Sequence, residues 1–220
     1  MLRTSGEIDT GPRGNPDRRS RPVKTSVGFQ CFSHHRWLTL LRKLGRCSPS
    51  NREAGMGVYE GGCLCGAVRY ETLADPLRVT TCHCRFCQRA TGSAYVVEPI
   101  FRTVDFRVTQ GSPSTYNHRS EGSGKLVYIH FCAACRTKLY MTFERFQTSC
   151  GVYAGTFDDP NWFEIGDSNS KHIFIEAARH ETILPPGIPA FSQHAMTNDG
   201  APQEPMVFEE PRVVGRGVTS

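Results

Sequence analysis

The sequence predicts a mainly β domain with few short helices, stabilised by zinc. Three observations support this prediction: short runs of alternating apolar and polar residues recur from residue 57 onward, turn residues separate them, and seven of the ten cysteines fall into three clusters. A period of two is typical of strands that bury one face. Clustered thiolates favour a soft divalent metal, which in a cell is most often zinc.

The predicted elements run from residue 67 to residue 177. Val104-Asp105-Phe106-Arg107-Val108 shows the alternation of a half-buried strand. The predicted strands cover residues 67–71, 78–82, 94–98, 104–109, 126–131, 138–143 and 172–177, with one short central helix over 85–89. Residues 111–114 and 122–124 are rich in glycine, serine and proline and predict loops, and residues 158–161 predict a turn.

Composition divides the chain into three expected parts: a basic extension over residues 1–55, a zinc domain over 56–192 and a flexible polar tail over 193–220. Residues 1–55 carry a net charge of +7, whereas residues 56–220 carry −2. We expect the extension to be disordered, although an Arg- and Ser-rich presequence remains an alternative. Met56 directly precedes the first patterned segment, so translation could also begin there. The basic excess typical of a nucleic-acid module is missing from the cysteine-bearing part, which makes a nucleic-acid partner unlikely.

Targeting signals also bear on whether the cysteines are expected to form disulfides or to bind metal. The sequence contains neither a secretory signal nor an apolar stretch of roughly 18 residues that could span a bilayer. A reducing, cytoplasmic location with metal-bound thiolates is therefore expected in preference to a disulfide scaffold.

The first candidate metal site combines two distant pairs, Cys63 with Cys65 and Cys132 with Cys135. A Cys-x-Cys pair on a regular strand would hold its sulfurs too far apart for one zinc ion. The backbone must therefore bend, and three glycines surround the pair to permit it: Gly61, Gly62 and Gly66. One ion shared by the two pairs would close a loop of nearly seventy residues, so we assign these four cysteines to a structural zinc.

The second candidate site is Cys82-His83-Cys84-Arg85-Phe86-Cys87. Three thiolates supply three corners of a tetrahedron and leave the fourth open, as in catalytic zinc sites. We therefore predict catalytic roles for Cys82, Cys84 and Cys87; the alternative is a second structural site with a fourth ligand elsewhere. Arg85 and Arg89 stand nearby to offset the negative charge or to bind an anionic substrate.

Three further residues are weaker candidates for a functional role. His83 should point away from the two cysteines that flank it if the segment is extended. His130 lies two residues before Cys132, so on a strand the two side chains would share a face. A role for His130 in supporting the metal ligands or in handling a proton is therefore one alternative, and a core histidine is the other. Cys150 stands alone and is expected to be a small buried residue.

At these residues the chain resembles the glutathione-dependent formaldehyde-activating enzyme family, whose zinc fold is shared with centromere protein V. The resemblance covers about residues 57–190. It is carried by the segments Gly61-Gly62-Cys63-Leu64-Cys65-Gly66-Ala67-Val68-Arg69-Tyr70, Cys82-His83-Cys84-Arg85-Phe86-Cys87-Gln88-Arg89-Ala90-Thr91-Gly92-Ser93 and Phe131-Cys132-Ala133-Ala134-Cys135. One departure is Arg136, which occupies a place where the family usually has glycine.

The resemblance implies an Mss4-like antiparallel β fold with two zinc ions, one structural and one catalytic, in the allocation given above. It also implies a carbon–sulfur lyase that joins glutathione, as co-substrate, to formaldehyde and gives S-hydroxymethylglutathione. The expected partners are then a small-molecule thiol and an aldehyde, with Arg85, Arg89 and Lys138 as candidates for binding the carboxylates of the thiol.

Two other functions remain open from the sequence. One is a non-catalytic zinc module that contacts nucleic acid through the basic extension, or contacts a protein partner. The other is a redox enzyme on the related methionine sulfoxide reductase fold, which would need a free activated cysteine. The sequence gives no indication of the oligomeric state.

Overall fold

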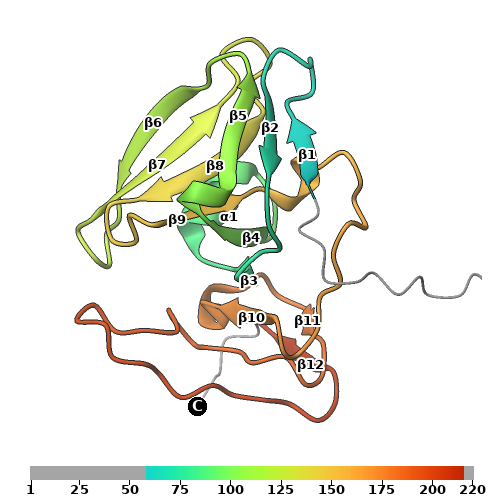
Figure 1. Cartoon of the computed structure of the whole chain (residues 1–220). Coiled ribbons are helices and arrows are strands. Elements are labelled where there is room, and N and C mark those ends of the chain that lie inside the picture. The colour runs from blue at the N-terminus through green and yellow to red at the C-terminus, as the bar shows by residue number, and fades with distance from the viewer. Residues whose placement is uncertain (1–57, 216–220) are drawn as a thin grey trace, which may run out of the picture. The chain divides into compact units, whose positions relative to one another are not determined.

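Three β-sheets make up residues 58–215, the part of the chain that this computed structural model describes (Figure 1). The elements in chain order are β1 (Tyr59–Gly62), β2 (Arg69–Thr72), β3 (Arg78–Cys82), α1 (Arg85–Thr91), β4 (Val96–Arg102), η1 (Thr103–Asp105), β5 (Phe106–Gln110), β6 (Ser114–Arg119), β7 (Leu126–Phe131), β8 (Lys138–Phe143), β9 (Ser149–Val152), η2 (Ala154–Thr156), β10 (Ser170–Ile173), η3 (Ile175–Ala177), β11 (Thr182–Leu184) and β12 (Arg212–Val214). The predicted mainly β fold is confirmed. The expected extension over residues 1–55 lies outside the described residues.

The largest sheet has seven strands in the order β10-β3-β4-β9-β8-β7-β6, and β1, β2 and β5 form a second sheet of three. Every pairing between two labelled strands is antiparallel except that of β10 with β3. In Figure 1 the hairpins β6–β7 and β7–β8 lie on one side of the β3–β4 pair and β10 lies on the other. The second cysteine cluster thus lies at the end of β3 in the large sheet, whereas the first is carried by one segment after β1 of the small sheet and one between β7 and β8 of the large sheet.

Three of the predicted strands have the predicted bounds: 78–82, 126–131 and 138–143. The strand expected over 172–177 instead ends at Ile173, because Phe174 adopts a left-handed backbone with φ 59° and a 3₁₀ turn follows. The strands expected over 67–71, 94–98 and 104–109 are displaced by one to four residues at their ends. Five strands were not predicted: β1, β6, β9, β11 and β12.

The apolar core forms separate clusters on different parts of the sheets. Tyr70, Phe101 and Leu139 belong to a cluster between the three-stranded sheet and the large sheet. A second cluster contains Ile129 and Met141 together with Cys82 and Cys87. The second site therefore rests directly on packed apolar side chains.

Residues 193–215 pack against the preceding part of the chain, in contrast to the flexible tail that the sequence predicted from residue 193. β12 pairs with β11, and Ala190 exchanges two backbone hydrogen bonds of 2.8 Å with Met206. Phe208 and Val214 pack against the buried cluster around Leu184. In Figure 1 this orange-to-red segment lies beside β10. Apolar residues spaced singly among prolines and glutamates hold it in place, which is why its polar composition was misleading.

Within the described range, no helix has the length and apolar character needed to cross a membrane.

Candidate metal centres and active site

The first cysteine cluster joins two turns that are far apart in sequence. Cys63 and Cys65 follow β1, whereas Cys132 and Cys135 occupy the turn between β7 and β8. Their four sulfurs all lie within 4.8 Å of one another. The Sγ atoms of Cys63 and Cys65 are 3.5 Å apart, and those of Cys65 and Cys132 are 3.7 Å apart. Sulfurs at the corners of a zinc tetrahedron with Zn–S bonds near 2.3 Å are about 3.8 Å apart. The donor set therefore fits one tetrahedral zinc ion.

Local backbone geometry produces this convergence. Gly66 has φ 74°, which favours glycine, and its N–H donates to the Cys63 carbonyl at 3.0 Å. A Cβ on Gly61 would lie 2.3 Å from the Tyr70 hydroxyl, so only glycine fits there. Arg136, the residue that departs from the family pattern, has φ 64° and donates its N–H to the Cys132 carbonyl at 2.9 Å. The turn thus forms with arginine in a conformation that glycine adopts more easily.

Hydrogen bonds to sulfur favour the thiolate form of Cys63 and Cys135, whereas the neighbouring cysteines raise the pKa of Cys65 to about 11. The Val68 N–H donates to Cys63 Sγ at 3.2 Å, and the Thr137 hydroxyl lies 3.1 Å from Cys135 Sγ. The side chain and backbone of Thr137 lower the pKa of Cys135 to about 5. Thiolate is the form that binds zinc, so this environment suits a metal ligand.

The second cluster lies at a strand-to-helix junction. Cys82 ends β3, Cys84 caps the N-terminus of α1, and Cys87 lies in its first turn. The three sulfurs lie within 4.8 Å of one another. The Cys87 N–H donates to Cys84 Sγ at 3.3 Å, and hydrogen bonds from the other two cysteine side chains are the main cause that lowers the pKa of Cys84 to about 3. The donor set fits three corners of a zinc tetrahedron.

His83 is not part of this cluster, although it lies between two of its cysteines. Its side chain is fully buried, and its Nε2 lies 3.1 Å from Nδ1 of His172 on β10. His130 does not support the first cluster. Its ring nitrogens instead lie 3.1 and 3.0 Å from the hydroxyls of Thr115 and Thr142.

Cys150 is buried apart from both clusters, and burial raises the pKa of its thiol to about 12. It is therefore a core residue, as predicted, and lacks the activated thiol that the redox function requires. All eight described cysteines are free thiols.

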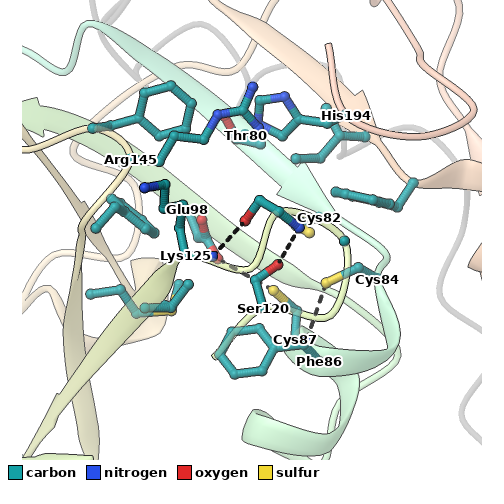
Figure 2. Close-up of a pocket in the computed structure, with 18 of the residues that line it drawn as sticks. Thr80, Cys82, Cys84, Phe86, Cys87, Glu98, Ser120, Lys125, Arg145 and His194 are labelled. Carbon is teal, nitrogen blue, oxygen red and sulfur yellow. Dashed lines mark hydrogen bonds between the residues drawn. The ribbon is translucent and has the colours of Figure 1, made fainter. Parts of the chain in front are cut away.

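Glu98 was missed by the sequence analysis. It lies on β4 opposite Thr80, and its Oε1 is 3.7 Å from Cys87 Sγ (Figure 2). Burial is the main cause that raises the pKa of this carboxyl to about 8, with the negative Cys84 second. A glutamate inside the apolar run Val96-Val97-Glu98-Pro99-Ile100 was the signal available in the sequence.

The second cluster opens on a cavity of about 940 Å³. Figure 2 shows Cys82, Cys84 and Cys87 on one side of this cavity and Arg145, Thr80 and His194 on another. Its lining is strongly cationic, with Arg78, Arg85, Arg89, Lys125, Lys138, Arg145 and Lys171 against only two glutamates, Glu98 and Glu121. The cavity thus combines soft metal ligands with a surface suited to anions. The first cluster does not line it.

The predicted substrate contacts Arg85, Arg89 and Lys138 all line this cavity. Arg85 and Arg89 extend from α1 and are exposed, and Arg85 donates a hydrogen bond to the Gln88 side chain. Four lining cations, Arg78, Lys125, Arg145 and Lys171, were not predicted. They come from separate segments of the chain, and only the sheet order brings them together.

Comparison with known proteins gives consistent results. The family profile described as glutathione-dependent formaldehyde-activating enzyme matches residues 58–177. A Halomonas elongata protein, provisionally named as such an enzyme, is 24% identical over 136 residues, which cover 53% of this chain and 87% of that protein. An uncharacterized lyase of Schizosaccharomyces pombe is 29% identical over 91 residues, 40% of this chain and 60% of that protein.

Among solved structures, a Rhodobacter sphaeroides protein has a TM-score of 0.38 and 23% identity, and the alignment covers 48% of this chain and 96% of that one. The family profile spans more than half of the chain and contains all seven clustered cysteines. The chain therefore belongs to the glutathione-dependent formaldehyde-activating enzyme family.

Proposed function

We propose that this protein is a zinc-dependent carbon–sulfur lyase-type enzyme that acts on aldehyde–thiol adducts, such as S-hydroxymethylglutathione formed from formaldehyde and glutathione. Family membership supports glutathione and formaldehyde as substrates, and the name of the S. pombe relative supports lyase chemistry. The observation that carries the proposal is the convergence of Cys82, Cys84 and Cys87 at a large cationic cavity. Three thiolates leave one tetrahedral position for a ligand.

In this proposal the two clusters have different roles. Cys63, Cys65, Cys132 and Cys135 would saturate a structural zinc ion that joins the turn after β1 to the β7–β8 turn. Cys82, Cys84 and Cys87 would hold a second ion, which would supply Lewis-acid chemistry and favour the thiolate form of a bound thiol. Clustered cysteines that would hold metal ions and that form no disulfide among the described residues fit a reducing compartment such as the cytoplasm.

The reaction needs little more than positioning. The carbon–sulfur bond forms between the thiol sulfur and the formaldehyde carbon, while the thiol proton is transferred to the carbonyl oxygen; the reverse direction breaks the same bond. Apolar walls that include Ile129, Met141 and Phe143 would exclude water from the sulfur, and the lining cations would orient the anionic thiol. Because formaldehyde offers few groups to recognise, selectivity would lie in the thiol.

The first test is zinc quantification on the purified chain, together with a glutathione-plus-formaldehyde assay. We expect two zinc ions per chain and a rate of adduct formation above the spontaneous rate. One ion per chain, or no acceleration at any thiol concentration, would contradict the proposal.

The second test replaces Cys84 with serine. We expect Cys84→Ser to lose one zinc ion and all enzymatic acceleration while its far-ultraviolet circular dichroism spectrum stays unchanged. Cys150→Ala is the matched control, because Cys150 lies in neither cluster, and it should keep both ions and the activity. Full activity in Cys84→Ser would remove the catalytic assignment. No observation on residues 58–215 favours the alternative of a non-catalytic binding module.

A further inference from the structure

One face of the β10-β3-β4 part of the sheet forms a wall of the cavity. Arg78, Thr80 and Cys82 alternate along β3 and all line the cavity, since residues two apart on a strand share a face. Lys171 on β10 pairs in register with Thr80, and Ile173 pairs with Cys82. Four strand positions place the Cα of Arg78 about 13 Å from that of Cys82. Arg78 and Lys171 thus lie on adjacent strands of the same cavity wall as Cys82.

Three cations of the cavity lining form no ion pair within the described part of the chain, although the charge of the exposed Asp199 interacts with that of Arg145. The three are Arg78, Lys171 and Arg145, and all are half-buried. Aromatic rings hold two of them instead: Lys171 Nζ lies 5.8 Å from the centroid of Phe191, and the Arg145 guanidinium lies 5.1 Å from that of Phe146. These two side chains are thus positioned by aromatic rings without a direct ion pair to a described carboxylate.

The three charges also lie close enough to act on the same neighbour. Burial lowers the pKa of His194, and positive Arg145, Lys171 and Arg78 lower it further. Burial likewise lowers the pKa of Lys171, with Arg78 as the second cause. Arg78 Nε is buried and has no hydrogen-bond partner. Grouped, partly desolvated cations are unfavourable unless an anion neutralises them.

Glu98 alone does not neutralise these three cations. It lies in the same row as Thr80 and Lys171, and its charge acts on Arg78. Even when ionised, it supplies one buried negative charge against three half-buried cations, and the other carboxylate that acts on them, Asp199 on Arg145, is exposed to solvent. It also contacts Cys87, at the sulfur side of the cavity. The wall keeps a positive excess that an anion of the substrate can match.

We propose that Arg78, Lys171 and Arg145 form a subsite for a carboxylate of the thiol substrate and thereby select thiols that carry a carboxylate over neutral thiols. This inference rests on the proposed function and deepens it. His194 adds to the subsite from a segment that lies beyond the family match at residues 58–177. Arginine and lysine on a packed sheet recognise a carboxylate by charge-assisted hydrogen bonds.

The test compares two unreactive probes, S-methylglutathione and its diester, in which both carboxylates are masked. Calorimetry on the zinc-loaded full chain should show that the acid binds at least about tenfold tighter than the diester, as expected for a charge-assisted contact of about 1.4 kcal/mol. Lys171→Gln and Arg145→Gln should each reduce this preference severalfold and leave diester binding unchanged. Arg78→Gln should do the same if it folds, which thermal unfolding will show.

Lys125→Gln is the matched control. Lys125 also lines the cavity, but it is exposed and pairs with Glu144 at 3.4 Å, so its replacement changes the net charge equally without removing an unpaired cation. The inference is wrong if the wild type binds neither probe or shows no preference. It is also wrong if Lys171→Gln and Arg145→Gln keep the full preference, or if Lys125→Gln loses as much.

A measurement of turnover distinguishes a failure of this inference from a failure of the proposed function. Acceleration of the glutathione reaction with equal binding of both probes would refute the subsite and leave the function standing. Selective binding of S-methylglutathione without any acceleration would support the subsite and refute the function.

Discussion

Individual residues carry most of the chemistry that the sequence made visible. The seven clustered cysteines were assigned to two groups from spacing and sulfur count, and the structure brings their sulfurs together in those groups. Their roles as zinc ligands remain a prediction. Glu98 and Arg78 were not assigned roles: Glu98 stands out within its apolar run, but a single charged residue in a strand does not indicate which cavity it faces.

Arg136 offers a stability test at the residue scale. A non-glycine residue in the left-handed region is strained, so Arg136→Gly should stabilise the zinc-loaded protein by about 1 kcal/mol. Urea unfolding of both forms gives the difference. Arg136→Ala is the control, because it removes the same side chain but keeps the Cβ that causes the strain. A glycine variant no more stable than the alanine variant would show that the turn is unstrained.

His172 offers a pH test. Burial lowers its pKa in the folded state, so the unfolded state binds more protons as the pH falls below about 6.5. Its contribution to stability is therefore complete above that pH and is lost on acidification, with a slope of at most about 1.4 kcal/mol per pH unit. His172→Asn cannot titrate and should lose less stability between pH 7.5 and 5.5. Equal losses in denaturant unfolding would contradict this, and zinc release affects both proteins alike.

At the scale of elements, strands were predicted more accurately where their hydrophobic pattern was stronger. β7 and β8 were predicted with their observed bounds because both are apolar hairpin strands beside a two-cysteine turn. β6 was missed because most of its residues are exposed, which suits the edge of the large sheet but removes the alternation. β9 contains Gly151 and a lone cysteine and gave no strand signal.

The first cysteine cluster connects elements that otherwise belong to different sheets. Cys132→Ser should therefore lose several kcal/mol of unfolding free energy, because in the proposed assignment one zinc ion would join turns nearly seventy residues apart. Cys84→Ser, at the second cluster, should lose much less, because its three cysteines lie within one six-residue segment. Thermal unfolding of the two variants measures the contrast. Equal destabilisation would show that the two clusters do not differ in structural role.

At the scale of the whole molecule, the C-terminal segment completes both the core and the cavity. Removing residues 193–220 would delete β12, expose the cluster around Leu184 and remove His194 from the cavity. We expect this truncation to lower the midpoint of thermal unfolding and to weaken binding of S-methylglutathione. A truncation after residue 215, which leaves every described contact in place, is the control. Equal behaviour of the two truncated proteins would show that the segment is dispensable.

The sequence by itself determined the class of fold, the two groups of cysteines and the family resemblance, because these depend on local alternation and on the spacing of ligand residues. Tertiary structure alone decided which strands pair, and therefore which charged side chains share a cavity. Lys171, Thr80 and Glu98 lie far apart in the chain, yet the register of three strands places them in one row. Such pairing depends on long-range packing, which no local pattern records.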